Sequence, residues 1–161
     1  MRRGGSGSKI FFFVLVGLAL GYFLISEAVK TIKPPLEVTF ATIGGQQEGT
    51  KVAIEGILHL PASTSYSPED RTNRIELLDF DSTEGIDIYI VEVKYGKTFE
   101  PNRMASLPTS YETDDFVVWL DDGTSLGDGE AVRVTGWLGI GEGGKAYINP
   151  VTKIERAIRA P

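Results

Sequence analysis

The segment from Gly127 to Arg156 constrains the fold more than any other part of the chain, because it carries the clearest strand pattern. Apolar side chains line one side of its first half, and glycines that tolerate positive φ follow at a sharp reversal. The apolar set is Val132, Val134, Trp137 and Ile140, and the glycines are Gly141, Gly143 and Gly144. The pattern predicts two β-strands joined by a glycine-rich turn and followed by a third short extended segment. We interpret it as the last hairpin of a small closed barrel.

A second feature is the run from Ile10 to Ile25, which carries no charged residue. Extended to Val29, the run would form a helix about 30 Å long, which matches the hydrocarbon core of a bilayer. We therefore expect a transmembrane helix over residues 10–29 that contacts membrane lipid. A basic tip over residues 1–9 precedes it, and a linker over residues 30–35 ends it with two successive prolines.

The basic residues around the apolar run set its expected orientation. Those before it are Arg2, Arg3 and Lys9, and those after it are Lys30 and Lys33. The bias favours a cytoplasmic N-terminus, so we expect a single-pass signal-anchor protein of the cell membrane with an extracytoplasmic C-terminal domain. A signal peptide cleaved near Ser26–Ala28 is the main alternative, and a core helix is disfavoured because the run has no polar side. Gly17 and Gly21 have the G-x-x-x-G spacing that can bring two membrane helices together as a dimer.

The charge of the remaining chain argues against nucleic acid as a partner. From Leu36 onward there are 21 acidic and 11 basic side chains, a net charge near -10. Binding to phosphates depends on an excess of Lys and Arg, so DNA and RNA are disfavoured. The chain has no cysteine, which excludes disulfides, thiolate nucleophiles and cysteine-ligated metal centres.

Alternating apolar residues predict further strands after the linker. The expected strands are 36–43 (a strand or extended lead-in), 51–60, a hairpin of 74–80 and 85–95, and 116–120. Gly56 inside the second of these is the expected bend or bulge. The segments Pro61–Asn73 and Gly96–Asp115 contain proline and polar residues and are expected to be loops, the second with room for at most one or two helical turns near 103–107.

These strands resemble the OB-fold superfamily in their glycine and valine spacing. A first coiled strand of the form G-x-x-V-x-v-x-G-x-l is matched by Gly49, Val52, Ile54, Gly56 and Leu58. A fourth strand of the form G-D-x-V-x-V-x-G-x-l is matched, with one extra residue, by Gly127, Asp128, Val132, Val134, Gly136 and Leu138, and the fifth by Val151–Glu155. The resemblance implies an all-β chain in which residues 36–158 form a small OB-like antiparallel barrel. A β-sandwich is the alternative, and residues 96–122 depart most from the pattern.

Several motifs match known functional patterns but have a simpler structural interpretation. The glycines from Gly139 to Lys145 match two phosphate-loop patterns, yet no helix can follow them, so a hairpin turn is expected. Gly123–Gly127 matches G-x-S-x-G, but strands flank it and the only histidine, His59, lies upstream. His59 is expected to face solvent or a loop. Carboxylates clustered in the turns raise calcium as a hypothesis, although the spacing does not fit an EF-hand.

Aromatic residues on the outside of a barrel are candidates for ligand contact, because OB modules stack rings on such a face. The candidates are Tyr89, Trp119, Trp137 and Tyr147, with the two loops named above beside them. We expect no catalytic residues, no cofactor and no metal.

The expected function is a non-enzymatic binding or assembly module with a protein or small-molecule partner. One alternative is a nucleic-acid-binding OB protein on the cytoplasmic face. A second is a carrier similar to the membrane-anchored haem chaperone of cytochrome c maturation, which also has one N-terminal anchor and an OB barrel. That family holds haem on a histidine after the barrel, and no histidine follows Lys153 here.

Overall fold

The computed structural model describes residues 34–158. Within this part of the chain, no helix is both long and apolar enough to cross a membrane. The expected helix over 10–29, the tip over 1–9 and the Gly17–Gly21 contact all lie outside the described residues.

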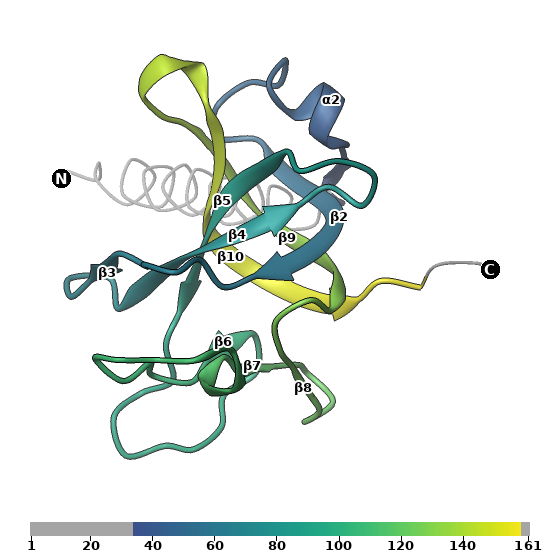
Figure 1. The fold of residues 1–161 in the computed structure, drawn as a ribbon. Helices are drawn as coiled ribbons and strands as arrows, with labels where there is room; N and C mark the ends of the chain where they lie inside the picture. The colour runs from purple at the N-terminus through teal and green to yellow at the C-terminus, as the bar shows by residue number, and fades with distance from the viewer. Residues whose placement is uncertain (1–33, 159–161) are drawn as a thin grey trace, which may run out of the picture. The chain divides into compact units, whose positions relative to one another are not determined.

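Five strands form a closed barrel (Figure 1). They are β2 (Lys51–His59), β4 (Thr72–Leu78), β5 (Gly85–Val91), β9 (Ala131–Ile140) and β10 (Ala146–Arg156). The order is β2-β9-β10-β5-β4, and β4 pairs with β2 to close the ring. The strands therefore close on themselves instead of forming the two stacked sheets of the alternative sandwich.

The strand order is compatible with an OB-like barrel, but the barrel is not antiparallel throughout as expected. β5 and β10 run parallel, with Tyr147 opposite Asp87 and Ile148 opposite Ile88. The reason is geometric, because strand directions cannot alternate all the way round a closed ring with an odd number of strands. At least one neighbouring pair must then be parallel.

The barrel interior is filled by side chains that alternate along the strands, as the sequence pattern predicts. The fully buried members include Val52, Ile54, Leu58, Ile75, Leu77, Ile88, Ile90, Val132, Val134 and Ile148. Gly56 allows a close approach where β2 passes from β9 to β4, since a Cβ there would lie 2.6 Å from the Leu78 carbonyl oxygen. The predicted bend is thus a point of contact between strands, without a register shift in the pairing of β2 with β9.

The predicted last hairpin is present as β9 and β10. Gly143 and Gly144 both have positive φ in the reversal, which contains the short 3-10 turn η2 (Glu142–Gly144). The expected third segment is part of β10 itself, which runs unbroken past irregular pairing with β9 between Ile148 and Lys153. The peptide bond between Asn149 and Pro150 is cis in this region.

Short elements complete the fold and correct two expectations. They are β1 (Leu36–Glu37), α2 (Phe40–Ile43), β3 (Tyr66–Ser67), β6 (Arg103–Met104), η1 (Thr113–Asp115), β7 (Val118–Trp119) and β8 (Ser125–Leu126). The expected strand over 36–43 ends at Glu37, because Thr39 begins a helical turn in which its N–H donates to Thr42 Oγ1 at 2.9 Å. The one or two helical turns allowed near 103–107 do not begin at Arg103, because Arg103 and Met104 pair with β7 instead.

The segment between β5 and β9, residues 92–130, adds a small sheet of β6, β7 and β8 below the barrel in Figure 1. We call this segment the insertion. Its strands have only two residues each, yet Met104, Phe116, Val118 and Leu126 are buried in the same apolar cluster as the barrel interior. The insertion therefore belongs to the core of the domain.

Candidate functional site

Two of the predicted aromatic residues meet on the outside of the barrel. Tyr89 on β5 and Tyr147 on β10 have ring centroids 5.7 Å apart and planes inclined by 72°. This edge-to-face contact is a favoured geometry for aromatic pairs. The two rings are half-buried, so they leave part of their surface open to a ligand.

A glycine on β9, Gly139, makes room for the ring of Tyr147. Gly139 lies opposite Tyr147, and a Cβ on Gly139 would come within 2.3 Å of Tyr147 Cζ. The tyrosine ring therefore occupies the space that any other side chain at position 139 would need. The Tyr147 ring can take this position only because residue 139 has no side chain.

An ion pair lies beside the tyrosines. Arg74 on β4 faces Tyr89 across the ladder, and its Nε is 3.8 Å from Asp87 Oδ1. Arg74 Nε is buried and donates no hydrogen bond within the described residues. Burial raises the pKa of the Tyr89 hydroxyl, the negative charge of Asp87 adds to this effect, and Arg74 opposes it. Tyr89 thus stays a neutral hydrogen-bonding group.

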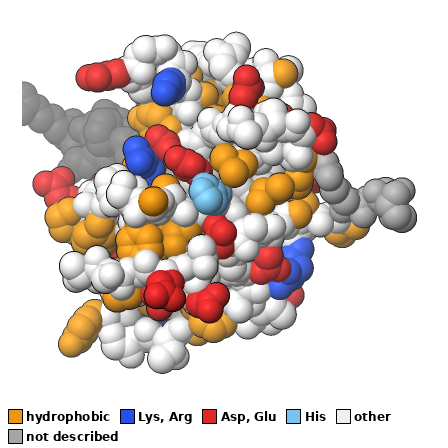
Figure 2. All heavy atoms as spheres, viewed as in Figure 1, with side chains coloured by type: hydrophobic (Ala, Val, Ile, Leu, Met, Phe, Trp, Pro, Cys, Tyr) orange, Lys and Arg blue, Asp and Glu red, His pale blue; other side chains and the backbone are white. Residues whose placement is uncertain are grey.

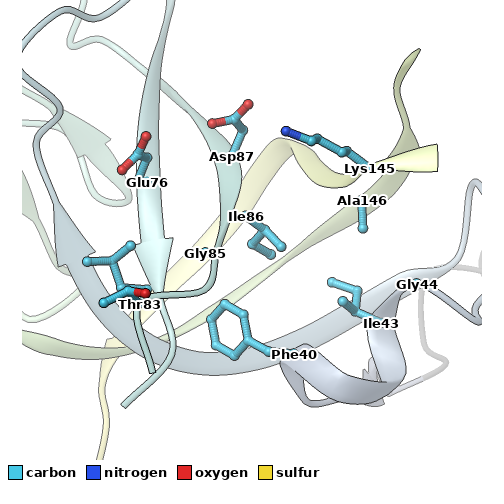
Figure 3. A pocket seen from close by; sticks show the side chains of 11 residues that line it. Phe40, Ile43, Gly44, Glu76, Thr83, Gly85, Ile86, Asp87, Lys145 and Ala146 are labelled. Carbon is cyan, nitrogen blue, oxygen red and sulfur yellow. The ribbon is translucent and has the colours of Figure 1, made fainter. Parts of the chain in front are cut away.

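A hollow of about 430 Å³ opens next to this ion pair (Figure 3). It lies between α2, the end of β4 and the starts of β5 and β10. Its lining includes Phe40, Glu76, Ile86, Asp87 and Lys145. Asp87 lines the hollow, pairs with Arg74 and lies opposite Tyr147 in the sheet. The hollow and the tyrosine pair therefore form one continuous surface, which we call the β5–β10 face.

The sequence did not reveal the hollow, because one of its walls is α2. A weak signal was present, since Phe40 and Ile43 are three residues apart and follow a threonine that can begin a helical turn. The alternation of Leu36, Val38 and Phe40 indicated a strand instead. Side-chain bonding between Thr39 and Thr42 decided the local conformation.

The other two predicted aromatic residues lie apart from the tyrosine pair. Trp137 is 41% exposed on β9, two residues before Gly139 and therefore on the same outer side of that strand. Trp119 is on β7 in the insertion, where its ring contacts Phe99 with centroids 5.6 Å apart. The β5–β10 face is thus bordered by Trp137 and excludes Trp119.

The two predicted loops contact each other. The Tyr111 hydroxyl donates to the Pro61 carbonyl oxygen at 3.0 Å and accepts from the Thr64 N–H at 2.7 Å. The first loop also contains β3, which pairs with β4, so its end at Thr72 and Asn73 is strand. These bonds join the insertion to the edge of the barrel.

The charged groups in the turns mostly hold the backbone. Asp128 accepts the Leu60 N–H at 2.7 Å and lies 3.4 Å from His59 Nδ1. Figure 2 shows this histidine at the surface, where 43% of its side chain is exposed. Asp122 accepts bonds from Thr124, which lower its pKa. In residues 34–158, no three His, Asp or Glu side chains gather as a metal site.

Neither glycine motif opens a helix suited to a phosphate or a nucleophile. The Gly141 N–H donates to the Lys145 carbonyl oxygen at 2.8 Å, which closes the hairpin as predicted. Ser125, the serine of the second motif, lies in β8, and the next element along the chain is the strand β9, so no helix follows this serine. No protein-family model matches this chain, and neither does any curated protein.

Proposed function

We propose that this chain is a single-pass membrane protein whose OB-like barrel serves as a non-catalytic binding or assembly module on the extracytoplasmic side. The observation that carries the proposal is the β5–β10 face. There, Tyr147 rests on the bare backbone of Gly139, contacts Tyr89, and adjoins a hollow. Ordered aromatic rings beside a concave surface are typical of ligand contact.

The net charge from Leu36 onward, near -10, favours a partner that is not a polyanion. The guanidinium of Arg74 already faces Asp87, and Glu76 adds a second carboxylate to the hollow. With Lys145 also in the lining, the β5–β10 face has no excess of positive charge, so the cytoplasmic nucleic-acid alternative gains no support. Measurable binding of single-stranded DNA or RNA at low salt would contradict this choice.

The membrane placement is tested with topology reporters on the full chain. A C-terminal alkaline phosphatase fusion should be active, and a C-terminal green fluorescent protein fusion should be dark if it is exported through the Sec route. The opposite pattern, an inactive phosphatase and a bright fluorescent protein, would contradict an extracytoplasmic domain. Extraction with alkaline carbonate separates an integral protein from a cleaved, released one.

The binding face is tested by photo-crosslinking in living cells. Benzoylphenylalanine in place of Tyr147 should give a defined adduct, whereas the same probe in place of Tyr95, a fully exposed residue of the insertion, should not. Gly139→Ala places a methyl group where the Tyr147 ring lies, so it should weaken the adduct formed by a probe at Tyr89. Equal adducts at positions 147 and 95 would contradict a specific face.

A further inference from the structure

The hollow beside α2 has an apolar wall opposite a charged one (Figure 3). Phe40 and Ile43 of α2 form the apolar wall, with Ile86 between the two sides. Glu76, Asp87 and Lys145 line the opposite wall. A ligand that fits both walls needs an apolar body and a charged head.

Two of the three charged groups are free to bind a ligand. Among the described residues, Glu76 and Lys145 have neither a hydrogen bond to their charged groups nor an ion pair, whereas Asp87 lies 3.8 Å from Arg74 Nε. The hollow thus offers one free carboxylate and one free ammonium.

The charges around the hollow balance. Glu76 and Asp87 contribute two negative charges, and Lys145 and Arg74 contribute two positive ones. A ligand with a net charge would gain one attraction and suffer one repulsion at Glu76 and Lys145. A ligand that carries both charges gains at both positions.

We propose that this hollow binds a small zwitterion with an apolar body, of the kind represented by a free apolar amino acid or a short apolar peptide. Its ammonium group binds Glu76, its carboxylate binds Lys145, and its side chain packs against Phe40 and Ile86. A hollow of about 430 Å³ is large enough for such a ligand. The inference rests on the proposed binding role of the β5–β10 face and names its class of ligand.

The test compares four ligands that share one apolar body. Leucine carries both charges, isoamylamine only the positive one, and 4-methylpentanoate only the negative one, while leucyl-glycine holds its charges farther apart. Binding to the full chain in nanodiscs is followed by the backbone amide signals of Gly85 and Ala146, which line the hollow. A zwitterion should bind about threefold more tightly than either singly charged ligand, as expected for one exposed ion pair.

Variants assign each charge to its partner. Glu76→Gln should weaken leucine and isoamylamine by about threefold and leave 4-methylpentanoate unchanged, and Lys145→Met should weaken leucine and 4-methylpentanoate only. Glu142→Gln and Lys94→Met, at exposed positions outside the hollow, are the matched controls and should change nothing. The difference between leucine and leucyl-glycine identifies the charge separation that the hollow prefers.

Several outcomes would overturn the inference. They are the absence of signal changes at Gly85 and Ala146 with both zwitterions, equal affinity for a singly charged ligand, or an unchanged preference in both variants. The topology and crosslinking experiments of the proposed function use cells, and this titration uses purified protein. Failure of one therefore does not imply failure of the other.

Discussion

The barrel and the insertion keep their shape in different ways. β2 and β9 pair over seven consecutive positions from Lys51 to Ile57, and β4 and β5 pair over the whole length of both strands. The strands of the insertion are two residues long and pair at two positions each. Backbone ladders hold the barrel, whereas the insertion depends on individual side chains.

Those side chains reach from the insertion into the barrel. Glu92 is 9% exposed and accepts hydrogen bonds from Asn73 Nδ2 at 2.8 Å and from Ser106 Oγ at 3.0 Å. Asn102 Oδ1 accepts the Ile154 N–H of β10 at 2.7 Å. Together with buried Phe116, these contacts show that a segment with little regular structure can be an integral part of one core.

The largest expected effect tests whether the insertion and the barrel unfold together. Phe116 is 1% exposed, so Phe116→Ala should lower the free energy of unfolding by about 4 kcal/mol through lost burial and a residual cavity. Urea denaturation of the full chain in detergent, followed by circular dichroism, should still show one transition. An early, separate transition would instead make the insertion an independent unit. Tyr95→Ala, at a fully exposed position, is the control.

The next effect tests the tight pairing of the barrel. A Cβ at Gly136 would lie 2.3 Å from Ile148 Cγ2 and 2.7 Å from the Pro150 carbonyl oxygen. Gly136→Ala should therefore cost about 3 kcal/mol of unfolding free energy, because β9 and β10 must move apart. Gly45→Ala, whose new Cβ would lie 3.6 Å from the Thr42 carbonyl oxygen, should cost less than about 1 kcal/mol. Equal denaturation midpoints for the two variants would contradict this account.

A smaller effect tests the polar attachment of the insertion. Glu92→Ala leaves the Asn73 amide and the Ser106 hydroxyl without their shared acceptor, which should cost about 2 kcal/mol. Glu92→Gln keeps one acceptor oxygen and should lose about half as much. Hydrogen exchange should quicken at Ala105, whose N–H donates to Val117 in the insertion, before it quickens in β2. Unchanged exchange at Ala105 would argue that Glu92 does not hold the insertion.

The smallest effect concerns pH at the point where the insertion joins β9. Burial raises the pKa of Glu130, but the Gly127 N–H and Arg156 outweigh it, so the pKa lies below its ordinary value. A lowered pKa in the folded state contributes stability above the ordinary carboxyl pKa, and this contribution is lost as the pH falls through the folded value. Glu130→Gln should therefore reduce the stability difference between neutral and acidic pH. Glu142→Gln is the control and should retain the wild-type stability difference. The same dependence of stability on pH in both variants would contradict a contribution from Glu130.

The barrel was more predictable than the insertion for a physical reason. A strand that buries one side chain in every two leaves a period in the sequence, which is why β2, the β4–β5 hairpin and the β9–β10 hairpin were found. Met104 is buried singly, between turns, and leaves no period, whereas Phe116, Val118 and Leu120 are buried in alternation within the strand expected over 116–120. The sequence left room for at most one or two helical turns near 103–107, and a strand in which Arg103 pairs with Trp119 formed instead.

The candidate site was predicted in part. The sequence named Tyr89 and Tyr147, and the structure brings their rings together. It also named Trp119, which the fold places in the insertion beside Phe99. The hollow was not predicted, because Glu76, Lys145 and Phe40 lie on three separate elements.

The amino-acid sequence by itself determined the local content of this protein, namely the positions of the long strands, the glycine reversal before Ala146 and the excess of acidic side chains. Only the tertiary structure decided that β5 runs parallel to β10, which places Tyr147 beside Asp87. The reason is that hydrophobic period and turn chemistry act between near neighbours in the chain. Closure of the barrel is a property of all its strands together, and the β5–β10 face exists only once the barrel is closed.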